Sequence, residues 1–322
     1  MKSILLKLLA ISAGLLIGST SAAAYPDKPV RIIVPWPAGG GADYVARAFG
    51  KELSDLWKQS VIIENVGGAG SIIGAERAAR AAPDGYTLML TINGTITSNR
   101  FLYKSLPYDP DKSFVPVSQL VQSGQLILVS SAVQANSMKE LVEQIRKSPN
   151  SMSYASYGNG TQPNLLFELM KKREGIDILH VPYKGLAPAL TAVMANEVQM
   201  TVVSPSSATG ALNSGRAKPI AIGSASRSSA LPDVPTVSEA NFPYMAATIW
   251  FGLFSPAGTP PEIVQKLQSD IATVVRQPAF AKSLEERGFD IVASDSAQFV
   301  KVIQEETART AEMAEAANIK PE

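Results

Sequence analysis

A glycine-rich loop between a predicted strand and a predicted helix is the segment best suited to hold a ligand. Residues 34–43 read VPWPAGGGAD, with two prolines that stiffen the loop and three glycines that let backbone N–H groups turn inward. We expect a helix to begin near Asp43, so its N–H groups and dipole face the same space. Such a nest binds a carboxylate or phosphate without a charged side chain. The alternative interpretation is a flexible turn without a ligand.

A second loop has a similar design. Residues 154–161 (YASYGNGT) leave a predicted strand and enter a helical run, with two glycines and the hydroxyl groups of Ser156 and Thr161. Two such nests, facing one another from two lobes, would hold both ends of a small acid. A third loop, residues 67–70, does not fit the G-x-G-x-x-G fingerprint of dinucleotide sites, and no P-loop motif occurs. We therefore expect no nucleotide cofactor.

Residues for catalysis or metal binding are scarce. The chain has no cysteine and one histidine, which excludes thiol nucleophiles, cysteine-bound zinc and sites with several histidines. No G-x-S-x-G motif is present. We interpret His180 as a strand-end histidine with one hydrogen-bond partner. Asp43 either caps the helix or approaches the ligand, and Lys184 faces either an anion or water.

The remaining pattern alternates predicted strands with predicted helices, which is typical of an α/β fold with parallel sheets and helices on both faces. Strands are predicted over residues 30–34, 61–63, 86–90, 126–129, 153–155, 178–181, 198–203 and 220–222. Helices are predicted after the glycine loop, over residues 72–82 and 138–145, from Thr259 as the N-cap, and from near Ser296.

Two series of strands and helices predict two lobes. The chain has 322 residues, enough for two domains. We place the crossings between lobes near residues 122–124 and 244–250. The first lobe then comprises residues 25–123 and 246–322, the second comprises residues 124–245, and a ligand cleft lies between them.

The first 24 residues are typical of a secretory signal peptide. Lys2 and Lys7 form a short positive region before an apolar run over residues 8–17, and an A-x-A site follows at residues 22–24. We expect cleavage after Ala24, because an apolar run of ten residues is too short for a membrane anchor. A formal net charge of +1 argues against a nucleic-acid partner, and we expect a monomer in the periplasm.

These loops, in this order, resemble the Bug receptors, the substrate-binding receptors of tripartite tricarboxylate transporters. The resemblance extends over residues 26–322, and its motifs lie at residues 35–47, 64–74, 84–87, 156–165, 180–185, 231–239 and 250–260. It implies a two-lobed Venus-flytrap fold of periplasmic binding proteins that closes on a small carboxylate. It also implies delivery of that ligand to inner-membrane permease subunits.

The resemblance also implies a set of ligand-binding residues. They are Trp36, Ala38, Gly39, Gly40, Gly41, Asp43, Asn93, Ser156, Gly158, Gly160, Thr161, Asn164 and Ser204. The sequence departs from the family pattern at residues 39–43, where GGGAD replaces the usual GGSTD, so two hydroxyl groups are missing. Asn164 also stands where a histidine is common. We hypothesise that the less polar pocket favours an apolar or aromatic acid over a hydroxylated one.

Three function classes remain open at this point. A binding protein without catalysis is favoured, because one histidine and no cysteine leave little for acid–base or nucleophilic chemistry. A receptor that presents its closed form to a sensor kinase would use the same closure. A periplasmic hydrolase or isomerase of carboxylic acids is the third class.

Overall fold

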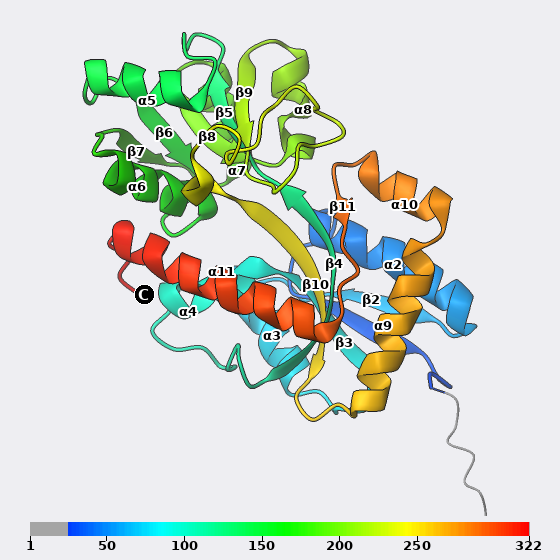
Figure 1. Cartoon of the computed structure of the whole chain (residues 1–322). Coiled ribbons are helices and arrows are strands. Elements are labelled where there is room, and N and C mark those ends of the chain that lie inside the picture. The colour runs from blue at the N-terminus through cyan, green and yellow to red at the C-terminus, as the bar shows by residue number, and fades with distance from the viewer. Residues whose placement is uncertain (1–24, 322) are drawn as a thin grey trace, which may run out of the picture.

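The computed structural model describes residues 25–321, which form two lobes, each built on one sheet (Figure 1). The expected signal peptide and its cleavage site after Ala24 lie outside the described residues. Within residues 25–321, no helix is both long and apolar enough to cross a membrane.

The first sheet has six strands in the order β11-β4-β10-β3-β1-β2. Their bounds are β1 (Val30–Val34), β2 (Val61–Asn65), β3 (Thr87–Ile92), β4 (Phe114–Gly124), β10 (Thr248–Pro256) and β11 (Asp290–Ile291). The helices of this lobe are α2 (Gly41–Trp57), α3 (Ile72–Ala79), α4 (Asn99–Leu102), α9 (Pro261–Val275) and α10 (Pro278–Glu285). Separate apolar clusters fill the two faces of the sheet, one beneath α2 and α9 and the other beneath α3.

The second sheet has five strands in the order β7-β6-β8-β5-β9. Their bounds are β5 (Leu126–Ser130), β6 (Ser153–Ser156), β7 (Leu179–Pro182), β8 (Met200–Val203) and β9 (Ala217–Ile222). Its helices are α5 (Met138–Lys147), α6 (Gln162–Glu174), α7 (Leu186–Met194) and α8 (Pro205–Asn213). One apolar cluster lies beneath α5 and α6, and another lies beneath α7 and α8.

Both sheets are mixed, whereas the alternating pattern predicts parallel ones. The predicted parallel pairing is found for β1 with β2 and β3, and for β6 with β7 and β8. The antiparallel pairs involve β4, β5 and β10, which lie where the chain runs from one lobe into the other. β4 continues into β5 without an intervening helix, and only one turn of 3-10 helix, Pro243–Met245, precedes β10, so the direction of these strands is not set by a strand–α-helix–strand unit.

Three extended segments lie side by side where the lobes meet. The N–H of Gln125 donates to the carbonyl of Ala247 at 2.9 Å, and the N–H of Gly223 donates to the carbonyl of Gln125 at 2.8 Å. The N–H of Ala247 in turn donates to the carbonyl of Gly223 at 3.0 Å. A side chain at Gly223 has no room, because its Cβ would lie 2.4 Å from the nitrogen of Ala247. We call these three hydrogen-bonded segments the hinge.

Helix α11 (Ser296–Ala316) contacts both lobes, as the red helix of Figure 1 shows. Phe299 and Ile303, near its start, pack in the first lobe beside Trp250. Met313 and Ala314, near its end, pack in the core of the second lobe. A capping box at Asp295 fixes its first turn. The predicted start near Ser296 is confirmed.

The predicted N-cap of α9 is wrong. Pro260 holds the cap position and the helix begins at Pro261. The hydroxyl of Thr259 donates instead to the carbonyl of Pro256 at 2.8 Å. A threonine in a short turn can bond back to the preceding carbonyl, and this local bond competes with capping.

Candidate functional site

The loop before α2 presents the start of that helix at the junction of the lobes. The helix begins at Gly41, two residues earlier than predicted, with Gly40 at the N-cap (φ −83°, ψ 175°). The N–H groups of its first turn have no acceptor inside the helix. Trp36, at the start of the loop, is fixed by a bond from its indole N–H to Thr91 Oγ1 at 3.1 Å. The loop therefore directs backbone donors and one aromatic ring to the same place.

Asp43 stabilises this loop from within its own lobe. Its carboxylate accepts the N–H of Gly39 at 2.9 Å and pairs with Arg47 at 2.9 Å. Although burial acts to raise it, bonds from Arg47 and the Gly39 amide hold the pKa of Asp43 below its usual value. Asp43 lies with Arg47 in an outer hollow and does not line the cavity described next. Its charge is therefore balanced locally.

The start of α8 faces this loop from the second lobe. Ser204 is the N-cap, its hydroxyl accepts the N–H of Ser207 at 3.3 Å, and Pro205 is the first helical residue. Ser204 was expected in the site, whereas Ser206 and Ser207 were not. The Ser-Pro pair directly after a buried strand is itself a helix-start signal and would have indicated this second nest.

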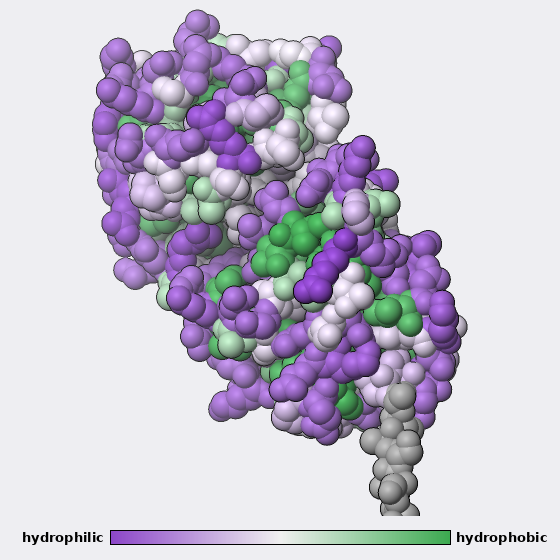
Figure 2. Space-filling view, turned by 45° about the vertical axis from the view of Figure 1, so that its right-hand side comes forward, coloured by the Kyte–Doolittle hydropathy of each residue, from purple (hydrophilic) through white to green (hydrophobic). Residues whose placement is uncertain are grey.

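The two helix starts line one cavity of about 390 Å³, which we call the interlobe cavity. The first lobe and the hinge supply Trp36, Pro37, Ala38, Gly40, Gly41, Ala42, Ile92, Ser123, Gln125, Ile249, Phe251 and Phe289, and the second lobe supplies Ser204, Ser206 and Ser207. None of these side chains carries a charge. Figure 2 shows apolar residues in green just below the junction of the lobes, on a face that is otherwise mostly polar.

The second predicted loop does not line the interlobe cavity. Its polar groups bond within their own lobe: the Thr161 hydroxyl to the carbonyl of Gly158 at 2.6 Å, and the Gly160 N–H to Asn164 Oδ1 at 2.9 Å. The loop also meets the first lobe, since a Cβ on Gly160 would lie 2.3 Å from Leu102. Gly160 and Asn164 line a different space of about 630 Å³, the flank hollow, together with His180.

His180 lies in β7 and forms a hydrogen-bonded pair with Ser156, so the predicted strand histidine has its partner, although the sequence does not identify that partner as Ser156. His180 Nε2 lies 2.6 Å from Ser156 Oγ, its Nδ1 lies 3.5 Å from Asn164 Nδ2, and its ring stacks on Tyr154 at 4.8 Å. The register of β6 and β7 brings the two strands together, which the sequence spacing does not reveal. Ser156 is fully buried in this arrangement, so its hydroxyl is not exposed at the surface of the lobe.

Burial lowers the pKa of His180 below its ordinary value of 6.5. The unfolded chain takes up this proton near pH 6.5, and the folded protein takes it up only at lower pH. We therefore expect the free energy of unfolding to decrease as the pH falls from about 6.5 to the folded pKa. His180 is the only histidine, so its ¹H NMR ring signals give that pKa directly. A midpoint at or above 6.5 contradicts the prediction, and a His180→Gln variant should lack this pH dependence.

Asn93, another predicted ligand contact, connects β10 with α11. Its amide donates to the carbonyl of Thr248 at 3.0 Å and to Glu306 Oε1 at 2.6 Å. The indole N–H of Trp250 bonds to the other oxygen of the same carboxylate. Burial raises the pKa of Glu306, although the Asn93 bond, Arg309 and the Trp250 bond act against it. The Asn93 side chain is thus occupied within the first lobe.

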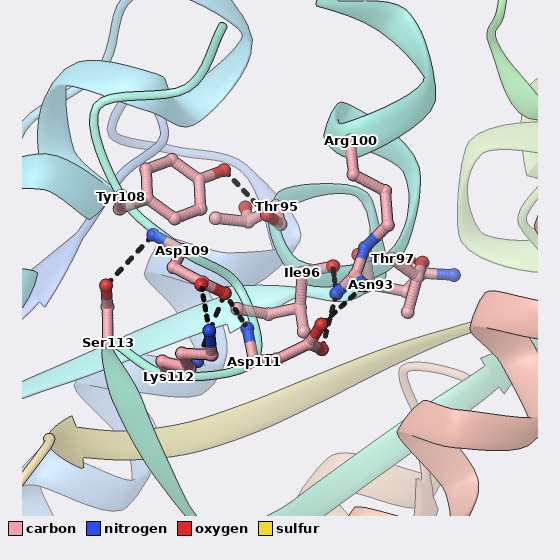
Figure 3. A network of polar contacts seen from close by, with 10 residues as sticks. All are labelled: Asn93, Thr95, Ile96, Thr97, Arg100, Tyr108, Asp109, Asp111, Lys112 and Ser113. Atoms are coloured by element: carbon pink, nitrogen blue, oxygen red, sulfur yellow. Dashed lines mark hydrogen bonds and ion pairs between the residues drawn. The ribbon is translucent and has the colours of Figure 1, made fainter.

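The segment after Asn93 is held by a polar network (Figure 3). The Tyr108 hydroxyl donates to the carbonyl of Thr95 at 2.7 Å. Arg100 forms a two-pronged pair with Asp111 at 2.8 and 2.9 Å and bonds to the carbonyl of Ile96 at 3.0 Å. This network fixes α4, whose Leu102 lies against the second loop.

Metal ligands are not grouped in the part of the chain that the structure describes. Between residues 25 and 321, no three or more His, Asp or Glu side chains lie where they could share a metal ion.

Comparison with known proteins yields one family and several related structures. The family described as "Tripartite tricarboxylate transporter family receptor" matches residues 45–319. Protein BugT of Bordetella pertussis is 32% identical over 292 residues, which is 90% of each chain. The solved structure of periplasmic binding protein BugD is 30% identical, with a TM-score of 0.74 over 92% of this chain and all of that one. Rpa4515 of R. palustris, solved with adipate, is 30% identical, with a TM-score of 0.78 over 92% of this chain and all of that one.

Proposed function

Because this chain belongs to the tripartite tricarboxylate transporter receptor family, we propose that it is a periplasmic receptor for a small carboxylate. The ligand binds in the interlobe cavity, the lobes close on it, and the closed form delivers it to inner-membrane permease subunits. The protein binds and does not catalyse. The adipate in the related Rpa4515 structure supports a carboxylate as the ligand class.

One observation carries this proposal: the starts of α2 and α8, from different lobes, both line the interlobe cavity, whose own lining has no charged side chain. The same helix starts also line an adjoining space of about 720 Å³, whose lining includes Glu286 and Arg287. Helix N-termini supply both hydrogen-bond donors and partial positive charge, so each attracts an anion. A ligand that bonds to both has more contacts in the closed form than in the open form. Its differential affinity then shifts the population towards closure.

The proposed contacts follow from this cavity. Trp36, Ala38, Gly40 and Gly41 approach the ligand from one lobe, and Ser204 does so from the other. Contacts from Ser156, Gly158, Gly160, Thr161 and Asn164 would need a rearrangement on closure, because that loop is bonded within its lobe. Contacts from Gly39, Asp43 and Asn93 would also need a rearrangement, because these residues are bonded within the first lobe.

We also propose the division of the mature chain. Residues 25–123 and 246–322 form one lobe and residues 124–245 form the other, with the last turns of α11 packed on the second lobe. A monomer is sufficient, since one chain supplies both sides of the cavity. We propose that the signal peptide directs export to the periplasm and is cleaved after Ala24.

A thermal-shift panel on refolded, ligand-free mature protein tests the function. It comprises aliphatic mono-, di- and tricarboxylates, acidic amino acids and aromatic acids. A ligand at 100 times its Kd adds about 2.7 kcal/mol to the free energy of unfolding, which raises Tm by several degrees. We expect one class of acids to raise Tm and to be recovered unchanged. No shift with any acid, or conversion of the acid, contradicts the proposal.

A further inference from the structure

The walls of the interlobe cavity are aromatic and aliphatic. Trp36, Phe251 and Phe289 lie around it together with Ile92 and Ile249. The rings are held in place: Phe251 meets Phe289 edge to face at 5.3 Å, and Phe289 stacks on Tyr44 at 5.9 Å. Ordered rings of this kind favour a flat apolar group between them.

Phe251 lies directly against the start of α2. A Cβ on Gly41 would lie 3.2 Å from the edge of the Phe251 ring, so the missing side chain lets the ring approach the helix end. The apolar wall therefore adjoins the backbone donors that attract an anion. A carboxylate and an apolar body fit side by side in this arrangement.

The hinge contributes two polar side chains to the same cavity. Ser123 is 6% exposed and Gln125 is 1% exposed, and their side chains share one side of the extended chain because they are two residues apart. The Ser123 hydroxyl has no hydrogen-bond partner among residues 25–321, and neither has the Gln125 side-chain oxygen. The Gln125 amide nitrogen has only a long bond of 3.4 Å to the Ser123 carbonyl. Both oxygens are open to the cavity, because neither is among the enclosed side-chain atoms that lack a partner within residues 25–321, and a ligand in the cavity can therefore bond with them.

The lining of the cavity contains no lysine, arginine, histidine, aspartate or glutamate. A carboxylate at the helix starts is stabilised there without a cationic side chain. The hinge offers neutral groups, and both the Ser123 hydroxyl and the Gln125 side-chain oxygen can accept a hydrogen bond, which a ligand hydroxyl can donate and an ionised carboxylate cannot. This combination distinguishes an acid with one neutral polar end from a hydroxylated di- or tricarboxylate.

We infer that the ligand is an aromatic monocarboxylic acid that carries a hydroxyl group, and that Ser123 and Gln125 determine this specificity. The carboxylate lies at the starts of α2 and α8, the ring lies among Trp36, Phe251 and Phe289, and the hydroxyl bonds with Ser123 and Gln125. This inference rests on the proposed function, since it names the class of carboxylate for the same cavity.

Calorimetric titration with four acids tests the inference: 4-hydroxybenzoate, benzoate, malate and citrate. We expect 4-hydroxybenzoate to bind about tenfold more tightly than benzoate, because benzoate leaves the hinge groups unpaired. Malate and citrate should bind at least 100-fold more weakly, since they have no ring for the aromatic walls. The Gln125→Met variant should bind 4-hydroxybenzoate with about tenfold lower affinity and should bind benzoate with unchanged affinity.

Two further variants complete the design. Gln304→Met is the matched control, because Gln304 is exposed on α11. Ser123→Ala repeats the test with a smaller change in case Gln125→Met does not fold. Tight binding of malate or citrate alone overturns the inference and leaves the proposed function standing. Equal binding of both aromatic acids by all variants overturns the role of Ser123 and Gln125. If no acid in this set or in the wider panel binds, the proposed function fails as well.

Discussion

Replacing Gly40 with valine is expected to weaken carboxylate binding strongly and to leave the fold intact. Valine adopts the backbone angles of Gly40 (φ −83°, ψ 175°) without strain, and the nearest atom to its Cβ is the Pro37 carbonyl oxygen at an ordinary 3.7 Å. The added methyl groups stand at the N-cap that lines the interlobe cavity, where they keep an anion from the first-turn amides. Loss of these charge-assisted bonds costs about 3 kcal/mol, or roughly 100-fold in Kd.

The matched control for this variant is Gly210→Val. Gly210 is exposed in α8 and has no atom within 4 Å of its Cβ position, so valine there changes neither cavity nor core. Calorimetry gives Kd for both variants, and circular dichroism melts show that both fold. Binding by Gly40→Val within threefold of the natural protein would contradict the assignment of the α2 start as the anion site.

Replacing Gly223 with alanine should produce the largest loss of stability among single-methyl changes at the hinge. The Cβ would lie 2.4 Å from the nitrogen and 2.5 Å from the oxygen of Ala247, both backbone atoms of the neighbouring segment. The segments must separate, which breaks the bonds among Gln125, Gly223 and Ala247. We expect a cost of about 3 kcal/mol and a decrease in Tm of about 8 °C.

Thermal melts of two comparison variants provide reference values of Tm for this prediction. Gly124→Ala lies at the same crossing and meets Ser224 Oγ at 2.5 Å and Ser224 Cβ at 2.7 Å, so the segment at Ser224 must shift. Because it meets no backbone atom of the three bonded hinge residues, its decrease in Tm should be smaller. Gly210→Ala should leave Tm within 2 °C of the natural protein or raise it slightly, because alanine favours a helix more than glycine does. If the Gly223→Ala protein has the same Tm as the Gly210→Ala control, the segments of the hinge are not packed as closely as described.

The local elements could be predicted from the sequence where one pattern dominates. The strand over residues 30–34 is confirmed as β1, because five largely apolar residues are bounded by turn residues. The 11-residue strand β4 was missed, since its sequence FVPVSQLVQSG contains a proline and four polar residues. Most of these residues are buried because β4 lies inside the first sheet. Its neighbouring strands come from distant parts of the sequence, so the local sequence does not reveal this burial.

The sequence indicated one side of the interlobe cavity as a whole loop and the other side by Ser204 alone. The GGG loop before α2 combines proline, glycine and a helix start within ten residues, and the structure places it on the cavity. The opposing side was expected at residues 154–161, but the start of α8 lies there. Both segments follow strands of the same sheet, β6 and β8, and the sequence does not show which of them faces the other lobe. Phe251 and Ser123 come from β10 and β4, whose return between the lobes is likewise a long-range property.

A crystal structure of the mature protein with the acid that raises Tm most tests the central claim directly. We predict that the carboxylate oxygens lie within hydrogen-bond distance of first-turn N–H groups of α2 and α8, with the lobes closed around the acid. Density for the acid in the flank hollow beside Gly160 and His180, with the interlobe cavity free of it, would contradict the claim.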